Sequence, residues 1–271
     1  MKINRLFFRM IPEGNVKEAM RSLYYRLYYN RKRSRENGFY VYYKKGVFEY
    51  RFKNDISFLS CVKVEGELKR SLKGYVRNHE IKSGEVVIDC GADVGEFTLY
   101  AAKKVGGSGR VVAFEPDLLM YDKLKLNIQL NRLDNVTIVN KGVWSNKTVL
   151  KFINAEKKFI EAESDPKPVL TDDNDMTGIS VVSLDEELKS LGVDKIDFIK
   201  RDVEGSEIEA VTGAEDILKN NNPDLAIASY HEIGGEKTCI KLEEMLRGLG
   251  YTAETSYPQH LTTYASKRGR A

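Results

Sequence analysis

Two apolar runs joined by a glycine-containing segment constrain the fold of this chain more than any other feature. The first run, Val86–Cys90, leads into Gly91 and Gly95, and the second run, Arg110–Phe114, is followed by Glu115. This order predicts a strand, a tight turn, a helix and a second strand. Glycine lets the turn backbone approach a ligand closely, and an acid after the second strand can accept hydrogen bonds from ribose hydroxyls. The segment therefore predicts a pocket for a nucleoside.

The residues of the turn favour a sulfonium cofactor over a dinucleotide. Dinucleotide sites typically carry G-x-G-x-x-G, whose middle glycine admits the pyrophosphate. Here Ala92 and Asp93 follow the first glycine, and the carboxylate of Asp93 would repel a pyrophosphate. Acids at Asp89, Asp93 and Glu96 instead suit the positive charge of S-adenosylmethionine. An ordinary turn between strand and helix, with no ligand, is the alternative.

From residue 81 onward the pattern alternates between strands and helices. Such alternation predicts a parallel sheet with right-handed crossovers and helices on both faces, so ligands lie at the carboxyl ends of the strands. The predicted strands cover 86–90, 110–116, 136–140, 148–153, 181–185, 195–203 and 224–230, with a final pair near 251–256 and 260–266; the later helices cover 118–131, 207–219 and 236–249. The polar segment 154–178 is predicted to be a long loop, and its Asp172–Asp175 run does not fit a calcium-binding EF-hand.

The charge distribution divides the chain into a basic extension, 1–80, and a domain, 81–271. Residues 1–80 contain 19 Lys and Arg against 8 Asp and Glu, whereas the remainder contains 24 against 32. The extension is predicted to form a helix through 21–35, a hairpin from 39 to 52 and a helix over 55–80. Residues 1–37 could contact an anionic membrane surface or nucleic acid, although a solvated helix explains the same composition.

Nothing in the sequence predicts a membrane span or a disulfide framework. The first ten residues are interrupted by charge, unlike a signal peptide, and no run is long enough to cross a bilayer. The three cysteines are odd in number and lack the spacing of metal ligands. A cytoplasmic location is therefore expected, with association at the membrane periphery as a possibility that the basic extension adds.

Three motifs resemble those of the FkbM-type S-adenosylmethionine-dependent methyltransferases. They are Val87–Thr98, Ala113–Pro116 and Ile199–Glu207, of which Asp202-Val203-Glu204-Gly205 is the most specific, and the resemblance covers roughly residues 80 to 250. It implies a class I methyltransferase fold, which is an α/β, Rossmann-like fold with seven strands in the order 3-2-1-4-5-7-6 and strand 7 antiparallel. It also implies methyl transfer to a hydroxyl, often of a sugar. Asp93, where the family usually has Asn, and Arg201, where an apolar residue is more usual, depart from the pattern.

Four ionisable residues are predicted to lie where a methyl acceptor binds. Asp202 and Glu204 follow the fourth core strand, and His231 and Glu232 follow the next one, on the same rim. His231 is the preferred general base, because an unperturbed imidazole is largely neutral at cell pH. The carboxylates could orient His231 or hold the acceptor, and the same four residues could bind a divalent metal. Purely structural roles, a strand-end cap for His231 and a closed turn for Asp202 and Glu204, explain the same positions.

The remaining candidates surround the cofactor. Gly142, Val143 and Trp144 follow the third strand, where the resemblance implies an adenine ring, although a lone Trp is more often part of a core. The full set of predicted cofactor contacts is Asp89, Gly91, Ala92, Asp93, Gly95, Glu96, Thr98, Glu115, Pro116, Gly142, Val143, Trp144 and Asp202.

Two other functions stay open at this point. A nucleic-acid methyltransferase is suggested by the basic extension, but base-amine enzymes usually carry Asn or Asp followed by Pro-Pro and an aromatic residue where this chain has Asp202–Gly205. Pyrimidine-C5 enzymes need a cysteine nucleophile on the rim, and no cysteine lies there. A non-catalytic membrane-surface or interaction protein on the same fold predicts cofactor binding without turnover, or no binding.

Overall fold

The computed structural model describes most of the predicted domain and part of the extension. The described residues are 31–36, 39–44, 49–53, 72, 74–153, 158–161, 178–233, 235–257 and 261–267. The predicted helix over 55–80 lies largely outside them, and its described end is helical at Leu72, Gly74 and Tyr75. The Asp172–Asp175 run also lies outside them.

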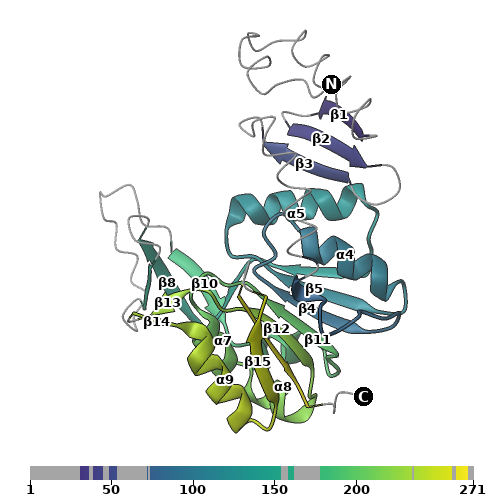
Figure 1. Ribbon diagram of the computed structural model, residues 1–271. Coiled ribbons are helices and arrows are strands. Elements are labelled where there is room, and N and C mark those ends of the chain that lie inside the picture. Colours follow the sequence, from purple (N-terminus) through teal and green to yellow (C-terminus); the bar gives the residue numbers. More distant parts are fainter. Residues whose placement is uncertain are drawn as a thin grey trace, which may run out of the picture.

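A seven-stranded sheet forms the centre of the domain (Figure 1). Its strand order is β6-β5-β4-β11-β12-β16-β15, and all neighbours are parallel except that β16 runs antiparallel to β12 and β15. In order along the chain this is 3-2-1-4-5-7-6, so the predicted fold class is confirmed. The strands are β4 (Val86–Cys90), β5 (Arg110–Phe114), β6 (Val136–Val139), β11 (Phe198–Arg201), β12 (Asp224–Ala228), β15 (Thr252–Ser256) and β16 (Thr262–Ser266).

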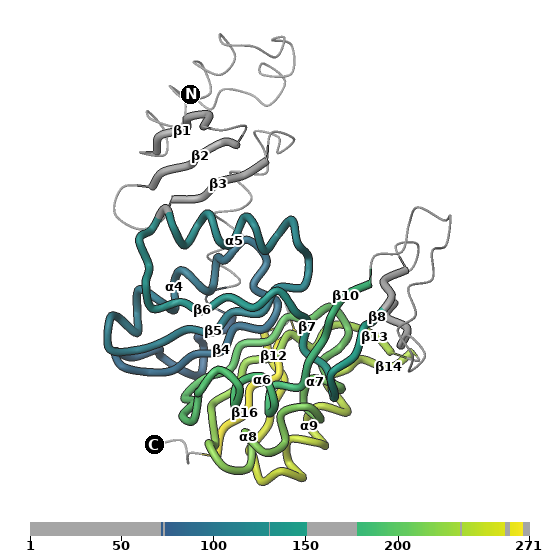
Figure 2. The backbone as a smooth tube through the Cα atoms, turned by 180° about the vertical axis from the view of Figure 1, so that it is seen from behind, coloured from purple at the N-terminus to yellow at the C-terminus, as the bar shows by residue number. Residues whose placement is uncertain are grey.

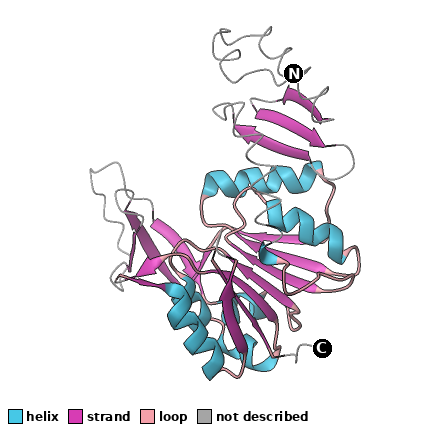
Figure 3. Ribbon diagram, in the orientation of Figure 1, coloured by secondary structure: helices cyan, strands magenta, loops and turns pink. Residues whose placement is uncertain are grey.

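Helices pack on both faces of this sheet (Figure 3). One face carries α4, whose buried residues join Tyr75 and alternate strand residues in one apolar cluster, with α5 beside it. The other face carries α6, α7, α8 and α9, which contribute to a second, larger cluster. The helices are α4 (Glu96–Val105), α5 (Leu118–Leu130), α6 (Leu184–Ser190), α7 (Glu207–Thr212), α8 (Glu215–Asn220) and α9 (Thr238–Gly248).

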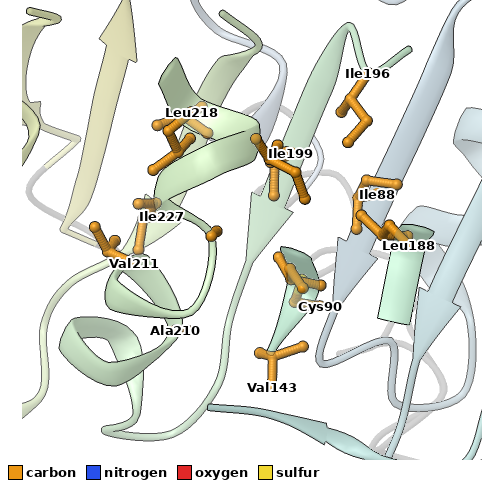
Figure 4. Close-up of a cluster of buried hydrophobic side chains, with 14 of the residues drawn as sticks. Ile88, Cys90, Val143, Leu188, Ile196, Ile199, Ala210, Val211, Leu218 and Ile227 are labelled. Atoms are coloured by element: carbon orange, nitrogen blue, oxygen red, sulfur yellow. The ribbon is translucent and has the colours of Figure 1, made fainter. Parts of the chain in front are cut away.

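The larger cluster explains why the core strands are so apolar. Ile88, Ile199 and Ile227 from three neighbouring strands point into it together, and Figure 4 shows them with helical residues such as Leu188 and Val211. These side chains are essentially inaccessible to solvent. A sheet that is covered on both faces needs apolar residues at successive positions, which is the pattern of these runs.

One helix departs from its predicted length. The predicted helix over 207–219 is two helices, α7 and α8, which meet at Gly213 and Ala214. A side chain at Gly213 would overlap the carbonyl oxygen of Trp144, so the close approach of two backbones sets the break. Glycine at this position permits that approach.

A smaller sheet lies beside the main one (Figure 2). Its order is β7-β10-β8-β9, with β7 parallel to β10 and the other pairs antiparallel. The sequence predicted strands near 148–153 and 181–185 but not their pairing, nor the strand within the predicted loop 154–178. The strands are β7 (Gly142–Val143), β8 (Thr148–Ile153), β9 (Lys158–Glu161) and β10 (Gly178–Val182), and a short pair, β13 (Glu232–Ile233) and β14 (Glu236–Lys237), precedes α9.

The described part of the extension is a three-stranded antiparallel sheet, β1-β2-β3, and β3 lies against α5 (Figure 1). Its strands are β1 (Arg31–Glu36), β2 (Phe39–Lys44) and β3 (Glu49–Lys53). The predicted hairpin is confirmed as β2 and β3. The prediction of a helix continuing to Arg35 is wrong for residues 31–36, because they pair with β2. Within the described residues, no helix has the length and apolar character that crossing a membrane requires.

Candidate active site

The glycine turn between β4 and α4 is built by close backbone packing. The amides of Gly91 and Ala92 both donate to the carbonyl of Phe114, at 3.0 and 2.9 Å. Gly91 has φ 77°, and a side chain there would overlap the carbonyl oxygen of Asp202. Gly95 has φ 93°, and its Cβ would lie 2.5 Å from Cδ1 of Leu124. Both glycines are therefore required by the architecture, whether or not a ligand is bound.

Asp93 is the exposed residue of the turn. It has φ 49°, a left-handed conformation that Asp and Asn adopt more readily than other side chains. The replacement of the family's Asn by Asp therefore preserves the backbone geometry. The turn is also held from outside, because the Asn127 amide on α5 donates to the carbonyl of Val94 at 2.6 Å.

Asp89 and Thr98 lie beneath the turn, and both are fully buried. The Thr98 hydroxyl donates to Asp89 Oδ2 at 2.6 Å, and Lys200 Nζ lies 3.0 Å from Asp89 Oδ1. Both side chains lie below the surface of the turn, and their role as cofactor contacts stays a prediction. They support the turn from inside the protein.

Lys200 is the residue that the sequence reasoning missed. Its ammonium donates to the carbonyls of Gly91, at 2.7 Å, and Cys90, at 3.4 Å, in addition to pairing with Asp89. Burial alone would lower the pKa of Lys200, but Asp89 and Asp202 outweigh this and raise it, so the side chain stays charged. The signal was a lysine in the middle of the predicted strand 195–203, because a buried charge must be paired.

Glu115, directly after β5, faces the same turn. Its two carboxylate oxygens accept hydrogen bonds from the amides of Asp93, at 2.7 Å, and Asp117, at 2.9 Å. Burial is the main cause that raises the pKa of Glu115 to about 7, with Asp93 and Asp117 adding to it. Each oxygen keeps a lone pair, so hydroxyl donors could still bind there and would favour the ionised carboxylate.

The segment after β6 lies beside Glu115 and Pro116. The Asn140 amide, which the sequence reasoning also missed, donates to the carbonyls of Glu115 at 2.8 Å and Pro116 at 3.2 Å. Gly142 and the buried Val143 form β7. Trp144 is half-buried, and its amide donates to the carbonyl of Val182 at 2.9 Å. Gly142 lies next to Pro116, which follows Glu115, and their role as cofactor contacts stays a prediction. The position of Trp144 fits a packing role as well as a contact.

Asp202 is fixed at the carboxyl end of β11 by two tyrosines. Its Oδ2 accepts from the hydroxyl of Tyr75 at 2.7 Å, and its Oδ1 accepts from the hydroxyl of Tyr230 at 3.3 Å. The backbone of Asp202 packs against Gly91, so this residue lies next to the glycine turn. Tyr75 comes from the end of the extension, which therefore contributes to the site.

His231 lies between two glutamates. Its Nε2 is 3.3 Å from Glu204 Oε2, and its Nδ1 is 2.8 Å from Glu207 Oε1. Burial would lower the pKa of His231, but these carboxylates raise it to about 9. The expectation of a neutral imidazole at cell pH is therefore wrong for this arrangement.

The structure brings three of the four predicted acceptor-side residues together. One ligand atom each from Asp202, Glu204 and His231 lies within 4.8 Å of the other two. Glu232, the fourth, is exposed on β13 and is not a member of this group. Glu96 lies at the start of α4, partly exposed, beside the turn.

Residues 89–253 match the methyltransferase FkbM domain. This span covers more than half of the chain and all of the site residues described above except Tyr75. The chain belongs to the FkbM methyltransferase family. Its members among curated proteins include the 31-O-demethyl-FK506 methyltransferase FkbM of Streptomyces tacrolimicus, which is 26% identical over 200 residues, covering 64% of this chain and 75% of that protein.

Two further relatives share shorter segments with this FkbM-family chain. The methyltransferase sdnD of Sordaria araneosa is 28% identical over 164 residues, covering 50% of this chain and 62% of sdnD. The ribosomal RNA large subunit methyltransferase E of Wigglesworthia glossinidia brevipalpis is 29% identical over 106 residues, covering 39% and 44%. The chain thus spans less than two thirds of these two relatives.

The fold agrees with that of a solved FkbM methyltransferase, from Methylobacillus flagellatus. The two match with a TM-score of 0.51 and 22% identity over 71% of this chain and 47% of that one. One departure from the family pattern lies in the core. Arg201 is fully buried, and no nitrogen of its guanidinium has a hydrogen-bond partner among the described residues. Burial lowers the pKa of Arg201, and the Cys90 thiol and Asp185 offset this only in part.

Proposed function

We propose that this chain is an S-adenosylmethionine-dependent methyltransferase that methylates a hydroxyl on a sugar, glycan or glycolipid-like acceptor. One observation carries the proposal: the backbone of Asp202, at the carboxyl end of β11, packs against the same turn whose Asp93 amide donates to Glu115. Cofactor and acceptor would therefore meet at the carboxyl edge of the sheet.

The residues around the turn fit this cofactor. Buried Glu115 has a pKa raised to about 7, and two ribose hydroxyls would supply the donors that favour its ionised form. The exposed carboxylate of Asp93 suits a cationic ligand. When bound, S-adenosylmethionine supplies a methyl group on a positively charged sulfur. Lys200 keeps the floor of the turn rigid by holding the Gly91 carbonyl and Asp89.

The acceptor side needs a group that orients a hydroxyl in line with the methyl group. Asp202 is suited to this because two tyrosine hydroxyls fix its carboxylate. Glu204 and His231 would complete the contact surface, since their side chains meet Asp202. Pre-positioned polar groups of this kind lower the cost of aligning the reactants.

The names of the relatives bear on the acceptor in two ways. The 31-O-demethyl-FK506 methyltransferase is named for an oxygen acceptor, which supports hydroxyl methylation. The relative named as a ribosomal RNA methyltransferase favours RNA as the second candidate, over a shorter match. Transfer to a base has less support, because Val203, Glu204 and Gly205 follow Asp202 in place of Pro-Pro and an aromatic residue, and no cysteine was predicted on the rim.

Transfer of a labelled methyl group from S-adenosylmethionine into separated cell-extract fractions tests the proposal. We expect incorporation into glycolipid, polysaccharide or small-metabolite fractions, and a strong loss of incorporation in Asp202→Asn. Incorporation confined to RNA would replace the acceptor class. Cofactor binding without incorporation into any fraction would instead support a non-catalytic protein.

The basic extension leads to a related proposal about location. A lipid-linked acceptor would explain a surplus of positive charge in residues 1–37, since anionic headgroups attract Lys and Arg. Flotation of the full chain with anionic liposomes, compared with a chain that lacks residues 1–37, tests this. Equal flotation of the two proteins would remove the membrane contact from the account.

A further inference from the structure

We propose that Asp202, Glu204 and His231 bind a divalent cation beside the glycine turn. The donor set consists of two carboxylates and one imidazole, which come from the ends of the adjacent strands β11 and β12. Mixed oxygen and imidazole donors suit a cation such as Mn²⁺. Binding of the cation does not depend on the proposed function, whereas a catalytic role for the cation rests on the proposed methyl transfer.

The distances between the donor atoms match a bound cation. The three atoms lie within 4.8 Å of one another, and His231 Nε2 is 3.3 Å from Glu204 Oε2. Ligands at about 2.1 to 2.3 Å from one cation are separated by roughly 3 Å when adjacent and 4.5 Å when opposite. A cation could therefore contact all three residues after side-chain shifts of a few tenths of an ångström.

A fourth residue, outside the donor set, supports the site from behind. Glu207 is fully buried, and its Oε1 accepts from the Gly205 amide at 2.9 Å and lies 2.8 Å from Nδ1 of His231 as an ion pair. Among the described residues, neither Glu207 Oε2 nor His231 Nδ1 has a hydrogen-bond partner. A metal-binding histidine usually gives its second ring nitrogen to a carboxylate, which leaves the first nitrogen directed at the metal. A buried carboxylate facing the ring is difficult to explain as a solvated surface group, because burying a charge is costly.

Hydrogen bonds from two tyrosines also fix the carboxylate of Asp202. Tyr75 donates to one of its oxygens and Tyr230 to the other, so the carboxylate is held in one orientation. The cluster brings three carboxylates, those of Asp202, Glu204 and Glu207, to a single imidazole. Binding through Nε2 would release the proton of His231, and the divalent cation would then balance the negative charge of the cluster.

The position gives the cation a defined task. Asp202 packs against the turn through its backbone, so a cation on its carboxylate would lie at the carboxyl edge of the sheet, where the proposed acceptor binds. There it would bind the acceptor hydroxyl, which lowers the pKa of that hydroxyl and orients its oxygen. Glu207 and Tyr75 act as positioning residues, because they reach the cation only through His231 and Asp202.

Titration of the full chain with Mn²⁺, followed by electron paramagnetic resonance and calorimetry, tests the site. We expect one Mn²⁺ per chain, with affinity lowered at least tenfold in Asp202→Asn and in His231→Ala. Glu207→Gln should weaken binding by about 10- to 100-fold, as loss of a supporting carboxylate does. Glu209→Gln, two residues further along α7, is the matched control and should bind Mn²⁺ like the wild type.

Melting curves of each variant establish that it is folded, and Asp202→Asn preserves the size of the side chain. The absence of Mn²⁺ binding up to about 1 mM would overturn the site. Equal affinity in wild type, Asp202→Asn and His231→Ala would overturn it as well. S-adenosylmethionine binding is measured in the same samples, so that a chain that binds the cofactor but not Mn²⁺ refutes the cation site alone. A chain that binds Mn²⁺ but no cofactor upholds the site and refutes the proposed function.

Discussion

Replacement of Gly91 by alanine tests whether the close packing of the turn against Asp202 is essential. The residue has φ 77°, and alanine in a left-handed conformation costs about 1 to 2 kcal/mol. Its Cβ would also lie 2.9 Å from the carbonyl carbon of Asp202 and nearer still to the carbonyl oxygen. Relief of such an overlap costs about 1 to 3 kcal/mol more, so the free energy of unfolding should fall by about 2 to 5 kcal/mol.

Gly84→Ala is the matched control, because it changes the backbone cost without the overlap. Gly84 has φ 83°, and the nearest atom to its Cβ would be Ser108 Oγ at 3.6 Å. This variant should lose only about 1 to 2 kcal/mol. The difference between the two variants therefore measures the contact with Asp202.

Chemical unfolding followed by circular dichroism gives both free energies, and calorimetry gives the affinity for S-adenosylmethionine. Gly91→Ala should be the less stable variant by about 1 to 3 kcal/mol and should bind the cofactor more weakly, because the turn moves away from β11. Equal losses in the two variants would refute the argument from close packing and leave only the requirement for a positive φ.

Three further predictions concern buried charges. Because the pKa of Glu115 is raised to about 7, cofactor affinity should increase as the pH rises from 6 to 8, and binding should release protons. Calorimetry in buffers of different ionisation enthalpy measures both effects, and Glu115→Gln should show neither. His79 lies between Asp224 and Glu85, and these carboxylates raise its pKa although burial opposes them. The stabilising effect of His79 is therefore complete below its unfolded-state pKa of about 6.5 and is lost as the pH rises through its folded-state pKa. The difference in melting temperature between wild type and His79→Gln should therefore shrink from pH 6 to 9, and a constant difference would contradict this. Arg201→Met should increase the free energy of unfolding by about 1 to 3 kcal/mol, since it removes a buried charge without hydrogen-bond partners, and a destabilised variant would show that the guanidinium is satisfied.

The central sheet could be predicted from the sequence because its signals are local. The runs at β4, β5 and β12 are strand-length and mostly apolar, and β11 begins with the apolar Phe198 and Ile199 and is followed by Asp202. The strand order came with the family resemblance, since alternation alone does not distinguish the possible orders. Strand β1 was predicted as part of a helix because residues 21–35 mix apolar and basic residues, and only pairing with β2 shows otherwise.

The site could be predicted as a set of residues but not as an electrostatic arrangement. His231 was expected to be neutral, yet its partner Glu207 precedes it by 24 positions on another element. Asp89 was expected to face a cofactor, and its buried partner Lys200 is on a different strand. Periodicity shows which side chains are buried but not which charges meet, because those contacts are set by the packing of distant segments.

The most direct test of the account is calorimetric titration of the full chain with S-adenosylmethionine, with Glu115→Ala and Glu215→Ala as variants. Glu215 is an acid on α8, away from the turn, where it pairs with Lys219. The account predicts one cofactor per chain, affinity reduced by about 10- to 100-fold in Glu115→Ala because charged hydrogen bonds to the ribose are lost, and unchanged affinity in Glu215→Ala. No binding by the wild-type chain, or equal binding by wild type and Glu115→Ala, would contradict it.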